Sequence, residues 1–219
     1  MSGVYNSPAA VPLVGPGVAV VVCITELNMR IISGSQRGRK LLGPRDSSVR
    51  PALDSVREAV FNILSSEVEG ARVLDLFCGI GAFGLEALSR GARKAHFVDN
   101  SSDSLAILRR NIELLGFDAF VSVEQGNAYG FHDSADAVYD LIFADPPFRV
   151  FKQEGGAERV FSMAERLLCP EPGREKRTMV LRLPSWYRQE PPFRVDDRRV
   201  YGESVVLFLS TPGDASGSS

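Results

Sequence analysis

One stretch, residues 73–84 with the sequence VLDLFCGIGAFG, limits the possible folds of this chain more than any other. A short apolar run that contains one acid, Asp75, is followed by three glycines in the spacing G-x-G-x-x-G. Residues 82–90 then have helical composition and end at Gly91. A strand, a glycine turn and a helix in this order let the backbone approach a nucleotide-like cofactor closely. The pattern fits a dinucleotide and S-adenosylmethionine equally well.

The rest of the chain alternates between the two periodicities of strands and helices. This alternation predicts an α/β fold with a mostly parallel sheet, and two final strands predict an antiparallel hairpin at its end. The expected strands are 73–77, 94–98, 120–123, 139–144, 178–183, 194–200 and 205–209, and the expected helices are 54–69, 82–90, 101–115 and 157–168.

Composition indicates one globular domain, which we place at residues 29–210. The 219 residues are 44% hydrophobic, which suffices for a core without disulfides. Three scattered cysteines and two histidines give no metal-ligand spacing, so we expect no metal and a reducing, cytoplasmic location. The net charge of −2 requires any nucleic-acid contact to come from a local patch.

Both ends of the chain differ from this domain. Residues 1–28 lack periodicity, and their apolar run 18–24 is too short to span a membrane. A disordered tail and a mis-assigned start with Met29 as the true one are both open, and an extra edge strand is a third alternative. Residues 211–219 are small and polar, and we expect them to be disordered.

A basic segment, residues 29–53, precedes the glycine turn. Residues 29–57 carry seven arginines and lysines against two aspartates, and residues 29–33 and 40–42 could pair as a hairpin. A solvated surface turn and a phosphate-contacting patch are both consistent with this composition. The candidate RNA-binding residues are Arg37, Arg39, Lys40 and Arg50.

Asp99 ends the second expected strand, twenty residues after Gly79. A carboxylate at this place in a doubly wound sheet can accept hydrogen bonds from both hydroxyls of a ribose. Dinucleotides and S-adenosylmethionine both contain that ribose, so Asp99 does not indicate which of the two cofactors binds. Two residues of the glycine turn and its helix are expected to have no role in chemistry. Cys78 is interpreted as a small filler and Glu86 as a solvated helix residue.

The loop Asp145, Pro146, Pro147 and Phe148 distinguishes between the two possible cofactors. It follows an apolar strand, at the edge where open α/β sheets bind ligands. Two prolines remove two backbone donors, so the loop offers a carboxylate, carbonyls and an aromatic ring. Such a set suits the exocyclic amine of a nucleobase, whose hydrogens would bind Asp145 and the Pro146 carbonyl while Phe148 stacks on the base. Hydride transfer has no evident use for it.

Together these motifs resemble the RsmD-type methyltransferases of bacterial small-subunit ribosomal RNA. The resemblance rests on RIISG (30–34), RGRKL (37–41), RP (50–51), VREAVFN (56–62), residues 75–92 and DPPF (145–148), in this order. It implies a Rossmann-like class I fold and S-adenosylmethionine-dependent methylation of a guanine N2 in 16S rRNA. Asp99 stands where the family commonly has glutamate, which keeps the carboxylate.

The resemblance also implies the site residues. The expected cofactor-binding residues are Asp75, Phe77, Gly79, Gly81, Gly84, Asp99, Asn127 and Ala128, and the expected catalytic residues are Asp145, Pro146, Pro147 and Phe148. The expected partner is 16S rRNA, either free or within a partly assembled small subunit. Two alternatives stay open: methylation of adenine or cytosine amines in DNA, and a catalytically silent rRNA-binding assembly factor on the same fold.

Overall fold

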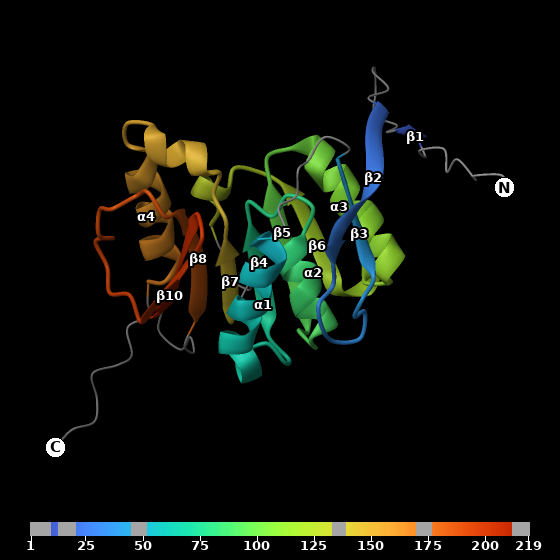
Figure 1. Cartoon of the computed structure of the whole chain (residues 1–219), viewed down its shortest axis with the longest axis horizontal. Coiled ribbons are helices and arrows are strands. Elements are labelled where there is room, and N and C mark those ends of the chain that lie inside the picture. Colours follow the sequence, from blue (N-terminus) through green and yellow to red (C-terminus); the bar gives the residue numbers. More distant parts are fainter. Residues whose placement is uncertain (1–9, 13–20, 45–51, 133–138, 170–176, 212–219) are drawn as a thin grey trace.

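The computed structural model describes residues 10–12, 21–44, 52–132, 139–169 and 177–211, with side chains from residue 29 onward except at 52 and 53 (Figure 1). Its strands are β1 (Ala10–Pro12), β2 (Val21–Arg30), β3 (Lys40–Pro44), β4 (Arg72–Leu76), β5 (Lys94–Asp99), β6 (Val121–Gln125), β7 (Leu141–Ala144), β8 (Thr178–Pro184), β9 (Asp197–Tyr201) and β10 (Ser204–Ser210). Its α-helices are α1 (Ala52–Leu64), α2 (Ala82–Ser89), α3 (Ser102–Leu115) and α4 (Gly156–Leu167). Short 3-10 turns are η1 (Ser65–Glu67), η2 (Asp118–Phe120), η3 (Ala128–Gly130) and η4 (Phe148–Lys152).

The central sheet has seven strands in the order β6-β5-β4-β7-β8-β10-β9. The first five are parallel, whereas β10 is antiparallel to both β8 and β9, as the sequence predicted. The chain leaves β4 toward β5 and β6 on one side and later returns to add β7 and β8 on the other. The strand order therefore reverses between β4 and β7, where sheets of this kind bind ligands at their carboxyl ends.

Helices cover both faces of this sheet because its central strands are apolar on both sides. Side chains of α1, α2 and α3 share one core with Val73, Leu141 and Phe143, whereas α4 and η4 share the other with Leu74 and Ile142. Successive residues of β4 and β7 thus enter opposite cores, as the alternation of a strand requires.

Helix α1 is shorter than the sequence predicted. The expected helix ran from 54 to 69, but α1 ends at Leu64 and the chain continues as η1. Ser65 has φ of +37°, a value that interrupts a right-handed helix. Strand β9 likewise begins at Asp197, three residues after the expected start at Arg194.

A second, three-stranded antiparallel sheet, β1-β2-β3, lies beside α3 (Figure 1). Residues Ala10–Pro12 and Val21–Arg30 are strands of this separate sheet, and the alternatives for residues 1–28 stay predictions. Strand β2 is longer than the expected strand at 29–33, because the β-branched residues before Met29 also pair, with Ile24 opposite Pro44. Residues 1–9, 13–20 and 212–219 lie outside the described residues, so the expected disorder there stays a prediction.

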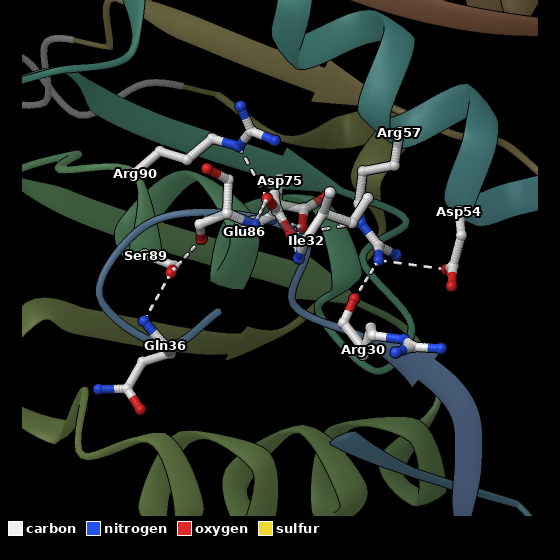
Figure 2. Close-up of polar contacts among 11 residues, drawn as sticks. Arg30, Ile32, Gln36, Asp54, Arg57, Asp75, Glu86, Ser89 and Arg90 are labelled. Carbon is white, nitrogen blue, oxygen red and sulfur yellow. Dashed lines mark hydrogen bonds and ion pairs between the residues drawn. The ribbon is translucent and has the colours of Figure 1, made fainter. Parts of the chain in front are cut away.

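The buried carboxylate of Glu86 fastens the turn after β2 to α2 (Figure 2). Its oxygens accept hydrogen bonds from the backbone N–H groups of Ile32 (2.8 Å) and Ser33 (3.0 Å), and Arg90 donates to it at 2.7 Å. Glu86 is 0% exposed, so the expectation of a solvated side chain was wrong. A buried charge persists only where partners replace its water, and here two come from the segment before α1 and one from the end of α2.

Arg57 of α1 joins the same cluster (Figure 2). Its guanidinium donates to the Arg30 carbonyl at 2.5 Å and to Asp54 at 3.2 Å, and its Nε lies 3.6 Å from Glu86 Oε2. Burial lowers the pKa of Arg57, and the charges of Asp54 and Glu86 oppose that effect. One buried cluster therefore connects β2, α1 and α2.

Asn111 fastens β3 to α3 in a comparable way. Its amide oxygen accepts the N–H of Leu42 at 2.8 Å, and its amide nitrogen donates to the Leu42 carbonyl at 3.1 Å and to the Ile80 carbonyl at 3.3 Å. The side chain thereby replaces a strand partner for Leu42 and also contacts the glycine turn.

We predict that Glu86→Ala lowers the free energy of unfolding by about 3–5 kcal/mol, because it removes one of the two carboxylates near the buried Arg57 and the acceptor of the Ile32 and Ser33 N–H groups. Urea titration followed by circular dichroism measures this change. Glu113→Ala is the matched control: Glu113 also contacts an arginine, Arg110, at 2.7 Å, but its side chain is 55% exposed. That pair should contribute about 1 kcal/mol or less. Equal losses in both variants would refute the role given to burial.

Candidate functional site

Asp75 organises the turn between β4 and α2. Its Oδ2 accepts the N–H of Gly84 at 2.8 Å, one of the helix-start donors that have no partner within α2. A Cβ on Gly84 would lie 2.3 Å from the Phe97 ring, so only glycine lets helix and sheet pack this closely. Between them Phe77 has φ of +55° and Gly81 has φ of +85°, which turn the chain away from the strand.

Burial raises the pKa of Asp75 well above its ordinary value; the hydrogen bond from Gly84 opposes this, and the charges of Asp145 and Asp99 add to it. The carboxylates of Asp75, Asp99 and Asp145 thus lie close enough to influence one another. Burial also raises the pKa of the Cys78 thiol far above its usual range, which agrees with a small filler rather than a nucleophile.

Asp99, at the end of β5, is held by two backbone donors. Gly79 N–H binds its Oδ2 and Ser101 N–H binds its Oδ1, both at 2.8 Å. A carboxylate has about four acceptor positions, so two remain for hydroxyl groups of a ligand. The glycine turn and the ribose candidate predicted from the sequence therefore touch each other.

A cavity of about 430 Å³ opens at this edge of the sheet. It is lined by Phe77, Asp99, Asn100, Tyr129, Asp145, Pro147, Arg149, Val150, Gln153 and Arg159. Four of the expected site residues, Phe77, Asp99, Asp145 and Pro147, are among them. The cavity thus joins the end of β5 to the loop after β7, and the aromatic rings of Phe77 and Tyr129 lie 4.8 Å apart in its wall.

The Asp145 loop has a partner that the sequence analysis missed. Arg182 of β8 forms a two-pronged ion pair with Asp145, with Nε–Oδ1 at 2.7 Å and Nη2–Oδ2 at 2.8 Å. Its guanidinium also lies 4.7 Å from the centre of the Phe148 ring. Leu181 pairs with Ala144 across the two strands, so the neighbouring residues Arg182 and Asp145 are brought together by the register of β7 and β8. No sequence motif marks Arg182.

Asn127 and Ala128 follow β6 at the same edge. The Asn127 side chain accepts the N–H of Tyr129 at 3.1 Å and so begins η3, while Ala128 is buried. Neither residue lines the described cavity, but they place the Tyr129 ring in its wall. Their assignment to the adenine stays a prediction.

The described basic residues expected to bind RNA lie far from this cavity. Ser35 N–H donates to the Ser89 carbonyl at the end of α2, and Arg39 donates to the Leu114 carbonyl at the end of α3. Helix α3 begins beside Asp99 and, with 14 residues, is about 20 Å long. Arg37, Arg39 and Lys40 are exposed at this opposite edge. Arg50 lies outside the described residues.

Among the described helices, none has the length and apolar character needed to cross a bilayer. The described residues also contain no group of three or more histidine, cysteine, aspartate or glutamate side chains arranged to hold a metal ion.

The reversal of strand order at β4, the glycine turn and Asp99 together define a Rossmann-like class I methyltransferase fold. A solved structure with this fold, the yhhF protein of Escherichia coli, matches with a TM-score of 0.66 and 28% identity, over 84% of this chain and 97% of that one. The fold class predicted from the sequence is confirmed.

The chain belongs to the RsmD-type family, since the family model described as "Conserved hypothetical protein 95" matches residues 29–170. It is 40% identical over 121 residues to "Ribosomal RNA small subunit methyltransferase D" of Escherichia coli strain K12, covering 55% of this chain and 61% of that protein. It is 35% identical over 152 residues to the protein of the same name from Haemophilus influenzae, covering 64% and 70% respectively.

The raised pKa of Asp75 predicts how the stability depends on pH. Because the folded state holds this proton more tightly than the unfolded chain, whose aspartate pKa is about 3.9, stability should fall as pH rises above about 4 through the folded pKa. Asp75→Asn removes this titration and should flatten that part of the profile. Urea unfolding of both proteins from pH 4 to 8 measures the difference. Parallel profiles would contradict a protonated Asp75 in the folded protein.

Proposed function

We propose that this protein transfers a methyl group from S-adenosylmethionine to the exocyclic N2 amine of a guanine in 16S ribosomal RNA. The observation that carries the proposal is the position of Asp145: it lines the same cavity as Asp99 and projects from a loop of acceptors beside an aromatic ring. Family membership supports the ribosomal substrate, and the cytoplasm is the compartment in which such a substrate is made.

The residues at the turn fit S-adenosylmethionine in three respects. Asp99 keeps acceptor positions for the two ribose hydroxyls. The carboxylates of Asp99 and Asp145 line the cavity, where a negative group favours the positive sulfonium. The cavity of about 430 Å³ is of a size typical for small-molecule sites. When bound, the cofactor supplies an electrophilic methyl group.

The acceptor loop explains how a poor nucleophile could react. The lone pair of a nucleobase amine is delocalised into the ring, so the amine must be oriented rather than strongly deprotonated. Asp145 Oδ and the Pro146 carbonyl would accept its two hydrogens, and Phe148 would stack on the base with its face opposite Arg182. This arrangement turns the nitrogen lone pair toward the methyl group, and alignment of this kind can supply much of the rate acceleration.

Bound S-adenosylmethionine would supply the methyl group to the amine nitrogen and would leave as the neutral thioether S-adenosylhomocysteine. The amine would then have one proton to lose, and Asp145 is placed to receive that proton and pass it to water. Arg182 acts through Asp145: its two hydrogen bonds fix the plane of the carboxylate. It is thus a positioning residue, held in turn by Ser204 at 3.1 Å.

Purified protein incubated with radiolabelled S-adenosylmethionine tests the proposal directly. The substrates are small subunits and partly assembled subunits from under-methylated cells, naked 16S rRNA and DNA. We expect label in ribosomal RNA, at N2-methylguanosine after digestion. Label on DNA alone would show that the protein is a DNA amino-methyltransferase. Tight RNA binding without label would support a catalytically silent assembly factor.

We predict that Asp145→Ala retains cofactor binding but lowers turnover by roughly 100-fold or more, because the amine loses its main acceptor. Calorimetry with S-adenosylhomocysteine and a single-turnover methylation assay measure the two properties separately. Glu154→Ala is the control, since Glu154 is an exposed acid close in sequence that does not line the cavity. Full activity of the Asp145 variant would refute the catalytic assignment.

We propose that Arg37, Arg39 and Lys40, at the edge of the sheet opposite the cavity, form a second contact with RNA. Arg37→Glu with Lys40→Glu should weaken RNA binding and reduce the slope of log affinity against log salt by about 0.7–0.9 per lost phosphate contact. Arg194→Glu is the control, because its side chain is 90% exposed elsewhere on the surface. An unchanged slope in the double variant would mean that residues 37–40 form a solvated turn.

A further inference from the structure

The only tryptophan of the chain, Trp186, lies on the surface beside the acceptor loop. It is 44% exposed and follows the end of β8 by two residues. Because β8 is parallel to β7, its carboxyl end lies at the same edge of the sheet as Asp145. A large aromatic side chain left in water at this place has a cost that packing does not explain.

Two cations connect Trp186 to the cavity. The ammonium group of Lys152 lies 5.4 Å from the centre of the Trp186 ring, within the range of a cation–π contact. Arg149, three residues earlier in η4, lines the cavity. Side chains at i and i+3 of a 3-10 turn lie above one another about 6 Å apart, so Arg149 and Lys152 project on the same side. Both are exposed.

The surroundings hold this arrangement in place. Tyr187 N–H donates to the Pro184 carbonyl and Ser185 N–H to the Glu203 carbonyl, which fixes the turn that carries Trp186. Phe151 of η4 packs 5.2 Å from the Tyr187 ring, and Phe148 at the other end of η4 lies against Arg182. η4 is thus joined to the turn after β8 at Phe151 and to β8 itself at Phe148, so the surface around Trp186 is formed before a ligand binds.

We propose that Trp186, Lys152 and Arg149 bind the nucleotide next to the methylated base. The neighbouring base stacks on Trp186, and the phosphate that links it to the target nucleotide lies against Arg149 and Lys152. Single-stranded RNA fits this surface because it offers a flat π face and a negative charge within one nucleotide, matching an exposed indole with two cations. This inference rests on the proposed function, because it requires that the base in the cavity belongs to an RNA strand.

Trp186 is its own reporter, since no other tryptophan contributes to the emission. Titration of the full-length protein with a short single-stranded oligoribonucleotide should quench the fluorescence, because a stacked base removes excited-state energy. Rising salt should reverse the quenching. Lys152→Ala and Arg149→Ala should each reduce the salt slope by about 0.7, the value for one phosphate contact on a single strand.

Affinity for a labelled oligoribonucleotide, measured by anisotropy, gives a second readout. Trp186→Ala should weaken binding by about tenfold, and Trp186→Phe should restore most of it, since stacking needs only an aromatic face. Phe120→Ala is the matched control: Phe120 is 48% exposed but precedes β6, at the opposite edge of the sheet. It should leave the affinity unchanged.

Three results of the binding experiments would overturn the inference: no quenching by RNA, equal effects of the Trp186 and Phe120 substitutions, or a change of emission with RNA-free ribosomal proteins only. The last result would assign the surface to a protein partner. The methylation assay separates this failure from that of the proposed function. Normal methyl transfer by the Trp186→Ala variant would refute only the role of Trp186, Lys152 and Arg149 in binding the neighbouring nucleotide. Quenching of Trp186 fluorescence by RNA in a protein that methylates no RNA would refute only the proposed reaction.

Discussion

The hydrogen bond from Gly84 N–H to Asp75 is the contact on which the site depends. It joins the end of β4 to the first turn of α2, and because the carboxylate is buried, no water can replace it. This contact fixes the backbone of the turn between these elements. The Gly79 N–H of that turn binds Asp99 at the end of the neighbouring strand, β5. A single buried acid in the middle of an apolar strand thus determines where the glycine turn, the ribose candidate and the cavity meet.

Helix α2 carries this order to the segment before α1. Glu86, two residues after Gly84, lies on the same short helix and binds the backbone at Ile32 and Ser33 as well as Arg57 and Arg90. Two buried carboxylates, one on β4 and one on α2, therefore connect the cofactor turn to an element that begins more than forty residues earlier. Any shift of α2 needed for ligand binding would have to move the turn after β2 with it.

The comparison between sequence and structure shows what local patterns can and cannot reveal. The apolar runs and glycine spacing predicted the parallel strands, the closing hairpin and the position of Asp99 at a strand end, because these follow from local periodicity and from a rule about strand ends. Arg182 was missed because its role comes from the register of β8 on β7, which has no local signature. Glu86 was misjudged for a similar reason: its backbone partners at Ile32 and Ser33 are more than fifty residues away, and helix composition alone suggests solvent. The assignments of Asn127 and Ala128 to the cofactor stay predictions.

The positions of the cations give the two edges of the sheet different roles. The cavity is lined by two carboxylates, Asp99 and Asp145, and by two guanidinium groups, Arg149 and Arg159. Carboxylates favour a positive cofactor and repel a phosphate backbone, and under the proposed function the cations beside them offset that repulsion. Arg149 is one of these cations, and Lys152, three residues later in η4, contacts Trp186. Arg37 and Lys40, separated from the cavity by roughly the length of α3, are too remote to act on the same nucleotide and could contact only a substrate that wraps around the domain. Under the proposed function, residues of η4 and β8 orient the base. The basic turn after β2 adds affinity for RNA without influencing which amine is presented.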